Sequence, residues 1–336
     1  MRDIKDYSLK AHNTFGLESR CNRFLEYENV EEARQVADIL RESKVPYIII
    51  GGGSNLLLTK DFEGIVVHSA VKGVSIEGRR MRCGSGEVWD DVVSKSIENG
   101  LYGLENLSLI PGDVGASAVQ NIGAYGMEAQ QFIDKVCAVE IATGRMCTFH
   151  RDDCCYGYRD SRFKHEWKNK YLICEVEYLL ADSFVPHLDY GNVCAELTKK
   201  GLTEKNVTAQ QVRETIIEIR EAKLPDPKIT GNAGSFFMNP VVQRETYERL
   251  AAQYEDIPHY DTADENLVKI PAGWLIEQCG WKGKSLGRAG VHDKQALVLV
   301  NRGGATGAEI VALCEAIRAD VKTKFQIEIR PEVNIV

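Results

Sequence analysis

The spacing of apolar residues over the first 70 positions predicts a helix followed by two strands. Apolar residues recur at helical spacing between positions 30 and 40, at Val30, Ala33, Val36, Ala37 and Leu40. Continuous apolar runs at 47–50 and 65–67 have the length and composition of buried strands. We therefore expect this region to be a mixed helix and strand segment.

From about residue 71 the pattern changes to short strands joined by tight turns. The sequences Glu77-Gly78-Arg79-Arg80 and Ala142-Thr143-Gly144-Arg145 are typical of turns between neighbouring strands. One helix is predicted at 87–99, with Gly100 at its C-terminal cap. A strand at 172–176 closes this region.

Two helices in the C-terminal half are predicted from their N-terminal residues. Thr208 with Gln211 matches a capping box, and the helix that it starts is expected to end near Lys223. Thr306 with Glu309 matches a second capping box. We expect the helix that follows it to reach about residue 325.

Together these patterns predict an α+β fold of several domains. The segment 183–206 is rich in loop-forming residues, which suggests a boundary near 190–207. The expected divisions are a first subdomain at 1–70, a second at 71–190, a third domain at 207–325, and a C-terminal strand segment at 326–336 that carries Glu332.

Composition excludes several classes of protein. The 336 residues carry a net charge of -8 and show no basic tail, which argues against nucleic acid as a partner. We see no apolar stretch long enough to span a membrane and no secretory signal. The 10 cysteines form no CxxC motif, so we expect reduced thiols, no metal site and a cytoplasmic protein.

A glycine-rich segment, Gly51-Gly52-Gly53-Ser54-Asn55, directly follows the predicted strand at 47–50. Glycines allow a phosphate to approach the backbone closely, where N–H groups can bind it. Leu56 stands where a dinucleotide-binding fingerprint needs its third glycine, and no Gly-Lys-Ser/Thr follows. A tight turn that merely ends the strand explains the segment equally well.

A second segment, residues 108–126, is long and rich in small residues. A ligand contacting its backbone would offset the entropy that so many glycines lose on ordering. A flexible surface connection is the alternative. The apolar Ile110, Val114, Val119 and Ile122 indicate instead that the segment packs against the protein.

Several short motifs stand in order along nearly the whole chain. They are Asn13-Thr14-Phe15-Gly16, Gly51-Gly52-Gly53-Ser54-Asn55, Ile110-Pro111-Gly112, Gly123-Ala124-Tyr125-Gly126, Gly157-Tyr158-Arg159-Asp160-Ser161, Lys223-Leu224-Pro225-Asp226-Pro227-Lys228, Gly231-Asn232-Ala233-Gly234-Ser235-Phe236-Phe237, Ala272-Gly273-Trp274-Leu275-Ile276 and Pro331-Glu332-Val333. In this order they resemble the UDP-N-acetylenolpyruvoylglucosamine reductase family of bacterial peptidoglycan precursor synthesis. The loop around Tyr190-Gly191 resembles the first of the family's two subtypes.

The resemblance implies a vanillyl-alcohol-oxidase-type FAD-binding fold, in which two subdomains hold the flavin and a C-terminal α+β domain binds substrate. It implies non-covalent FAD and NADPH as the hydride donor. The cofactor-binding residues that it implies are Gly51, Gly52, Gly53, Ser54, Asn55, Ile110, Pro111, Gly115, Ser117, Asn121, Ile122, Gly123 and Tyr125.

The resemblance also implies three catalytic residues. Arg159 would bind the substrate carboxylate with a two-pronged guanidinium, although from sequence alone a salt bridge with Asp160 is the simpler interpretation. Ser235 would donate the proton to the substrate, and otherwise reads as a turn serine. Glu332 would assist charge development on the carboxylate as a protonated acid with a raised pKa, and otherwise reads as a surface acid.

Substrate-binding positions implied by the resemblance are Tyr158, Tyr190, Lys223, Asn239 and Gln295. The loop around Tyr190 is a candidate lid, and NADPH is expected to use the substrate pocket first. The expected partners are therefore UDP-N-acetylglucosamine enolpyruvate and NADPH, bound by a monomer with no nucleic acid or membrane partner. Two alternatives remain open: another oxidase of the same flavin fold, and a nucleotide-sugar sensor without catalysis.

Overall fold

The computed structural model describes residues 1–255 and 257–336, which form two compact units. The first unit comprises Met1–Tyr7, Cys21–Gly52 and Phe62–Ala222, and the second comprises Ser8–Arg20, Gly53–Asp61 and Lys223–Val336. Each unit is therefore built from three separate stretches of chain. The four contiguous domains expected from sequence differ from this division, because helix α5 (Ala209–Lys223) packs in the first unit.

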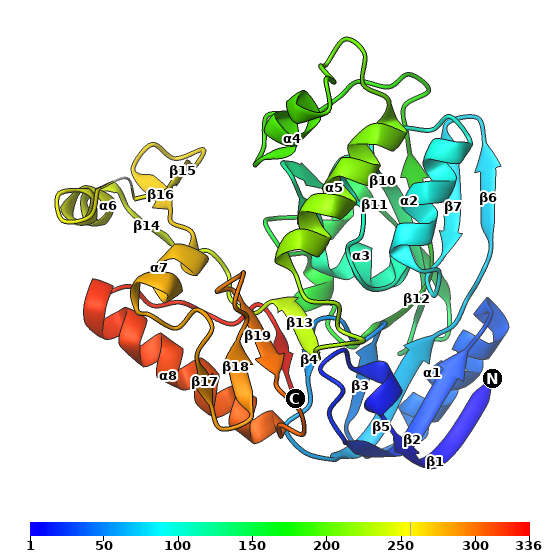
Figure 1. Cartoon of the computed structure of the whole chain (residues 1–336). Helices are drawn as coiled ribbons and strands as arrows, with labels where there is room; N and C mark the ends of the chain where they lie inside the picture. The colour runs from blue at the N-terminus through cyan, green and yellow to red at the C-terminus, as the bar shows by residue number, and fades with distance from the viewer. Residues whose placement is uncertain (256) are drawn as a thin grey trace. The chain divides into compact units, whose positions relative to one another are not determined.

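The first unit contains two sheets (Figure 1). One has the order β1-β2-β5-β3, and β2 and β3 both run parallel to β5. Its strands are β1 (Arg2–Ser8), β2 (Arg20–Tyr27), β3 (Tyr47–Ile50) and β5 (Phe62–Ser69). The predicted strand at 47–50 is confirmed residue for residue, and the strand predicted at 65–67 is the centre of β5.

The other sheet of this unit is antiparallel, in the order β11-β10-β12-β7-β6. Its strands are β6 (Val74–Glu77), β7 (Arg80–Gly84), β10 (Ile133–Glu140), β11 (Met146–His150) and β12 (Tyr171–Leu179). Both predicted turns connect strands of this sheet, so the change to hairpins after residue 71 is confirmed.

Helix α1 (Val30–Glu42) packs between the two sheets. Its buried face, which includes Ala33 and Leu40, contacts Leu25 of one sheet and Leu172 of the other. Figure 1 shows α2 (Trp89–Glu98), α3 (Val114–Gln120) and α5 in front of the antiparallel sheet. The helix predicted at 87–99 is confirmed as α2, with Gly100 at a φ of +70° just beyond its end.

Two predicted loops contain helices. The segment 183–206 holds α4 (Val193–Lys199), whose Val193 and Leu197 are buried with residues of α5. The glycine-rich segment 108–126 holds α3, with β8 (Gly123–Ala124) and β9 (Met127–Glu128) directly after it. Its apolar residues do pack, since Val114 and Ala118 are fully buried.

The second unit surrounds a core of its own. A sheet in the order β13-β19-β18-β17 is covered by α8 (Gly307–Phe325) and α7 (Ala272–Gln278). The remaining elements are β4 (Leu56–Leu57), β13 (Asn232–Ser235), β14 (Val241–Gln243), α6 (Arg244–Ala251), β15 (Tyr260–Asp261), β16 (Leu267–Lys269), β17 (Ser285–Leu286), β18 (Ala289–Val291), β19 (Val298–Asn301) and β20 (Asn334–Ile335). Short 3₁₀ helices, distributed over both units, lie at Lys10–His12, Glu105–Leu107, Ala129–Gln131, Arg151–Cys154 and Arg162–Lys164.

Both predicted capping boxes are present. Thr208 and Gln211 exchange hydrogen bonds at the start of α5, and Thr306 and Glu309 do so at the start of α8. The C-terminal strand expected at 326–336 is confirmed only in part, as β20, and its first residues, 326–330, form no strand. Ile327 and Ile329 are buried as an extended segment would place them, but these residues join no strand ladder, and pairing begins only around residue 331.

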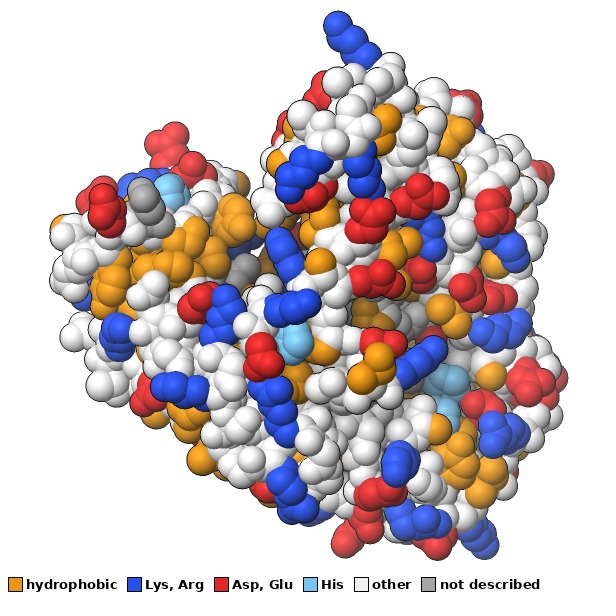
Figure 2. All heavy atoms as spheres, viewed as in Figure 1, with side chains coloured by type: hydrophobic (Ala, Val, Ile, Leu, Met, Phe, Trp, Pro, Cys, Tyr) orange, Lys and Arg blue, Asp and Glu red, His pale blue; other side chains and the backbone are white. Residues whose placement is uncertain are grey.

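The face drawn in Figure 2 carries acidic and basic side chains interspersed over its surface. Within the described residues, no helix is long and apolar enough to cross a membrane. No cluster of three or more potential metal ligands occurs among the same residues.

Candidate active site

Gly51 and Gly52 end β3 directly against the start of α3. A Cβ atom at Gly51 would lie 3.1 Å from the Cβ of Ala116, and one at Gly52 would lie 3.2 Å from Oδ1 of Asp113. Both contacts are tighter than ordinary van der Waals packing. Glycine at both positions lets the backbone of the turn pack on α3 without an intervening side chain.

Gly53 continues this turn into the second unit, and its reason for being glycine is different. Its φ is +70°, and a Cβ would lie 2.0 Å from the carbonyl oxygen of His12. The Gly53 carbonyl accepts a hydrogen bond from Thr14 N–H at 3.1 Å. The turn predicted from sequence is thus locked in place by residues 12–14 of the same unit.

The second glycine-rich segment is held by its polar side chains. Ser117 is fully buried, and its hydroxyl contacts the carbonyl of Val114 at 2.7 Å and the Tyr178 hydroxyl at 2.8 Å. Asn121, also buried and at a φ of +46°, donates to the carbonyl of Gly157 at 2.7 Å. Both side chains therefore fix the segment itself, and only their neighbours can present groups to a ligand.

The other predicted cofactor-binding residues differ in their surroundings. Gly115 donates its N–H to Ser85 at 2.8 Å, where a Cβ would be only 3.0 Å from the Ser85 side chain. Ile110 and Ile122 pack on the core of the first unit, and Pro111 is exposed. Ser54 is half-buried in the turn.

Arg159 lies in a tight turn that Gly157 and Asp160 close with a pair of backbone hydrogen bonds of 3.0 and 3.1 Å. Its φ of +54° is unusual for a residue with a side chain. The guanidinium donates to the carbonyls of Asn121, at 3.4 Å, and Gly123. The Asp160 carboxylate lies 2.7 Å from His165 Nε2, so it has a partner of its own. The structure thus joins Arg159 to the 121–123 segment.

Arg220 is a residue of this site that the sequence did not reveal. Burial lowers the pKa of its guanidinium, and the nearby Arg159 acts in the same direction, whereas Tyr125 and Asp90 oppose the change. Its side chain bonds to Tyr125, yet Nε is buried and finds no acceptor among the described residues. A buried donor beside a second cation suits an anionic oxygen of a ligand.

The segment around Tyr190 lies beside Tyr125 and Gly126, at the end of the second glycine-rich segment. A Cβ at Gly126 would be 3.3 Å from the Cβ of Tyr190, and one at Gly191 would be 3.7 Å from the ring of Tyr125. The amide of Asn106 bonds to the carbonyls of Tyr125 and His187, at 3.0 and 2.9 Å. Tyr190 and Tyr158 both keep their rings exposed, at 41% and 38%.

In the second unit, Ser235 and Glu332 come together from distant parts of the chain. Glu332 N–H donates to the carbonyl of Phe236 at 2.8 Å, and Phe237 pairs with Pro331. Phe236 and Phe237 are buried, whereas Ser235 is exposed and Glu332 is partly exposed. Asn55 adds a long hydrogen bond of 3.4 Å to the Glu332 carbonyl. Ser235, Glu332 and the end of the glycine turn therefore meet.

Asn239 and Gln295 both lie at the start of α7. The Asn239 side-chain oxygen accepts the N–H of Ala272 at 2.9 Å. The Gln295 oxygen would be 3.3 Å from a Cβ at Gly273, and it accepts from Leu297 N–H at the same distance. Lys223 is exposed at the end of α5. Of the five predicted substrate-binding residues, the structure thus brings Asn239 and Gln295 together, in the second unit.

Known sequences match the chain over nearly its whole length. Residues 226–336 match the C-terminal domain of UDP-N-acetylenolpyruvoylglucosamine reductase, and residues 22–150 match an FAD binding domain. A UDP-N-acetylenolpyruvoylglucosamine reductase from Bacteroides fragilis is 51% identical over 98% of this chain and 99% of its own length. The chain belongs to the UDP-N-acetylenolpyruvoylglucosamine reductase family.

Further relatives agree with this family membership. The reductase from Burkholderia cenocepacia is 44% identical, with 98% of this chain and 95% of that protein covered. The crystal structure of the reductase from Thermus caldophilus is similar in fold, with a TM-score of 0.69 and 19% identity over 99% of this chain and 98% of that one. The expected α+β fold, with an FAD-binding part and a C-terminal domain, is confirmed.

The residues of this family member fit FAD at the glycine turn and an anionic ligand at Arg220. Gly51 and Gly52 carry no side chain that could cover the backbone of the turn, so its N–H groups are the kind that can bind a diphosphate. Nε of Arg220 is a buried donor that lacks an acceptor within the described part of the chain, and an anionic group of a ligand would satisfy it.

Proposed function

We propose that this enzyme reduces the enolpyruvyl double bond of UDP-N-acetyl-enolpyruvoylglucosamine to give UDP-N-acetylmuramate, with NADPH as the reductant and FAD as the carrier. The reaction belongs to peptidoglycan precursor synthesis. The observation that carries this proposal is the hydrogen bond between Glu332 N–H and the Phe236 carbonyl, which holds a candidate proton donor, Ser235, beside a candidate acid.

FAD, when bound, would supply the hydride for the double bond, with NADPH as the source of its reducing equivalents. The protein must then hold the substrate carboxylate and deliver a proton to the adjacent carbon. The Gly51–Asn55 turn and the 110–125 segment would hold the cofactor. Ser117 and Asn121 would act there by shaping the segment, since their side chains are committed within it.

Arg159 and Arg220 would provide the positive charge for the anionic groups of the substrate. A guanidinium binds a carboxylate through two parallel hydrogen bonds and stabilises the charge that builds up on it during reduction. Each of these arginines already contacts the backbone or Tyr125, so its position is fixed before a ligand arrives. Such preorganisation avoids a reorganisation cost during the reaction.

Ser235 would donate its hydroxyl proton to the carbon next to the carboxylate, and Glu332 would assist charge development on the carboxylate. Serine is a weak acid, so this role needs a strongly basic carbon and a fixed geometry. Buried Phe236, next in the chain, anchors the backbone that carries the hydroxyl. Tyr190, Tyr158, Lys223, Asn239 and Gln295 would bind the nucleotide sugar. We further propose that the enzyme acts as a monomer in the cytoplasm.

The test separates the two half-reactions of the Ser235→Ala variant under anaerobic conditions. NADPH should still bleach the flavin at the wild-type rate, because that step needs no proton from Ser235. Reoxidation by the enolpyruvyl substrate should slow by about 10³-fold. Ser285→Ala, which removes an exposed hydroxyl from β17 of the same sheet, serves as the matched control and should leave both steps unchanged.

Three outcomes would contradict the proposal. Substrate that reoxidises the Ser235→Ala flavin at the normal rate would remove Ser235 from the mechanism. A wild-type flavin that only oxygen reoxidises would identify an oxidase of the same fold. Protein that binds the nucleotide sugar but no flavin would identify a sensor.

A further inference from the structure

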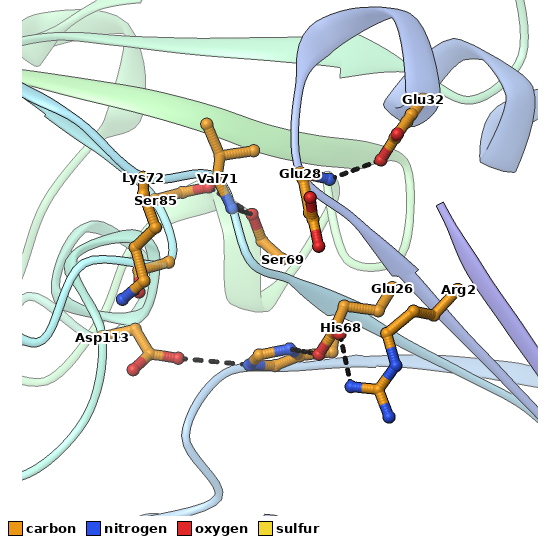
Figure 3. A network of polar contacts seen from close by, with 11 residues as sticks. Arg2, Glu26, Glu28, Glu32, His68, Ser69, Val71, Lys72, Ser85 and Asp113 are labelled. Atoms are coloured by element: carbon orange, nitrogen blue, oxygen red, sulfur yellow. Dashed lines mark hydrogen bonds and ion pairs between the residues drawn. The ribbon is translucent and has the colours of Figure 1, made fainter.

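A row of four alternating charges runs from the first strand to the start of α3, all within the first unit. Arg2 donates to Oε1 of Glu26 at 2.7 Å, and Oε2 of Glu26 lies 2.9 Å from Nδ1 of His68. The other ring nitrogen of His68 lies 3.5 Å from Oδ2 of Asp113. Figure 3 shows the four side chains in line, with His68 between the two carboxylates.

This row ends at the glycine turn. Asp113, the residue before α3, places Oδ1 3.2 Å and Oδ2 3.5 Å from the Cβ positions of Gly52 and Gly51 respectively. The side chains of His68 and Asp113 are each 14% exposed, so solvent screens them only partly. A carboxylate at this point would repel a diphosphate bound to the turn unless a cation balanced its charge.

The protonation state of His68 decides whether the charges of this row cancel. Protonated His68 gives the row two positive and two negative charges, whereas neutral His68 leaves one excess negative charge beside the turn. Burial favours the neutral ring, but the bonds to Asp113 and Glu26 outweigh it and raise the pKa of His68 above its ordinary value.

Two carboxylates act on the His68 ring. Glu26 faces it from β2 and Asp113 from the start of α3, and Arg2 and Tyr7 of β1 act through Glu26. The ring of Phe24, on β2, stacks on His68 without adding charge. The imidazole is therefore the one group in this row whose charge changes near neutral pH.

We propose that His68 is a charge-balancing residue that positions Asp113 at the glycine turn, so that the apoprotein binds the diphosphate of FAD more tightly when His68 is protonated. This inference rests on the proposed placement of the FAD diphosphate at the Gly51–Asn55 turn. Because binding and protonation are linked, FAD also favours the protonated ring, and its binding takes up a proton where the free ring is neutral.

The experiment titrates apoprotein, prepared by removing FAD from the holoenzyme, with FAD and follows the quenching of flavin fluorescence. Between about pH 6 and about pH 9, the wild-type dissociation constant should rise about tenfold. His68→Asn should bind weakly at every pH, and Asp113→Asn should bind tightly at every pH. Calorimetry in two buffers of different ionisation enthalpy should detect proton uptake by the wild type and by neither of these two variants.

Two comparisons make the result specific. His150→Asn, which removes an imidazole on β11, should behave as the wild type does. Riboflavin, which lacks the diphosphate, should bind with the same affinity at both ends of the pH range.

The failures can be told apart. If FAD binds no more tightly than riboflavin, the proposed diphosphate placement is wrong and the inference falls with it. If FAD binds much more tightly than riboflavin but His68→Asn keeps the wild-type pH dependence, the inference alone is overturned. It is also overturned if His68→Asn and Asp113→Asn change the affinity in the same direction.

Discussion

At the scale of single residues, the glycine turn shows that two neighbouring glycines can be required for different reasons. Gly52 faces a side chain that can move slightly, whereas Gly53 faces the backbone carbonyl of His12 at 2.0 Å from its Cβ position. A backbone carbonyl cannot move without displacing residues 12–14. Gly53 is thus the least replaceable residue of the turn.

Gly53→Ala should therefore destabilise the protein by about 3 kcal/mol or more, through the clash added to the strain of a positive φ. Urea denaturation of the purified variants measures the effect. Gly16→Ala is the matched control, since Gly16 has a similar φ of +64° but open space around its Cβ position. It should cost only about 1 kcal/mol. Equal losses in the two variants would show that the close approach to His12 is not what requires glycine.

Arg220 presents the opposite case, because we expect its buried charge to lower stability while it serves the proposed function. Its guanidinium is buried beside Arg159 with an unsatisfied Nε, so replacement by an apolar side chain removes an unfavourable buried charge. Arg220→Met should melt no lower than the wild type, while kcat/KM for the anionic substrate falls by about 10²-fold. Thermal melting and steady-state kinetics measure the two effects.

Arg213, seven residues earlier on α5, is the control for this variant. It donates two hydrogen bonds to the Asp90 carboxylate, at 2.6 and 2.9 Å, and these bonds lower the pKa of Asp90 despite its burial. Arg213→Met should lose about 3 kcal/mol of stability because it leaves that carboxylate unpaired. If both variants lost the same stability, Arg220 would be an ordinary structural residue.

At the scale of secondary structure, the sequence predicts those elements whose signals are local. The capping residues Thr208 and Thr306 predict α5 and α8 to within one residue of their starts, because a cap depends on side chains three residues apart. Helix α3 could not be predicted this way. Gly115 is a poor helix former, and it is accommodated in α3 through packing against Ser85. Whether residues 326–330 pair with another strand likewise depends on tertiary structure, so the local sequence could not show that they have no partner strand.

The same distinction applies to the site. Sequence motifs predicted Ser235, Glu332 and Arg159, and the structure confirms that the first two are neighbours within one unit. Arg220 escaped prediction because a buried charge depends on what surrounds it. Its spacing of seven residues from Arg213 places both on one side of α5, and this was the available signal.

The capping box of α8 gives a prediction at this scale. Thr306→Ala should cost about 1 kcal/mol, because it removes the acceptor for Glu309 N–H at 3.2 Å. Gln243→Ala is the control, since Gln243 precedes α6 without a side-chain cap. It should leave the urea midpoint unchanged. A loss shared by both variants would mean that the cap of α8 is not the cause.

Glu309 makes the stability of α8 depend on pH. Hydrogen bonds from Thr306 N–H and Arg288 lower its pKa to about 2. A depressed folded-state pKa stabilises the protein above the unfolded value, near 4.5, and the gain disappears as pH falls through about 2. Glu309→Gln should therefore melt below the wild type at neutral pH, with a gap that narrows as pH falls below about 4.5. A constant gap would assign the effect to something other than this carboxylate.

At the scale of the whole molecule, the chain divides into units that are each discontinuous in sequence. The second unit is built around residues 223–336, but its core includes Phe15 and Leu57 from the other stretches. Strand β4 pairs with β20, and Asn301 donates to the Phe15 carbonyl at 3.0 Å. The C-terminal family domain, residues 226–336, thus lacks part of the unit to which it belongs.

A fragment of residues 223–336 should accordingly fail to fold alone, because the apolar surface that Phe15, Leu17 and Leu57 cover would be exposed to water. Circular dichroism during urea denaturation should show no cooperative transition. As a control, cleavage of the intact protein at a protease site inserted near residue 203 should leave the midpoint nearly unchanged, since this exposed loop lies wholly inside the first unit. A fragment that unfolds cooperatively would show that residues 8–20 and 53–61 do not complete its core. A fragment that shows no cooperative transition would instead mean that residues 8–20 and 53–61 are needed to complete the core of the second unit.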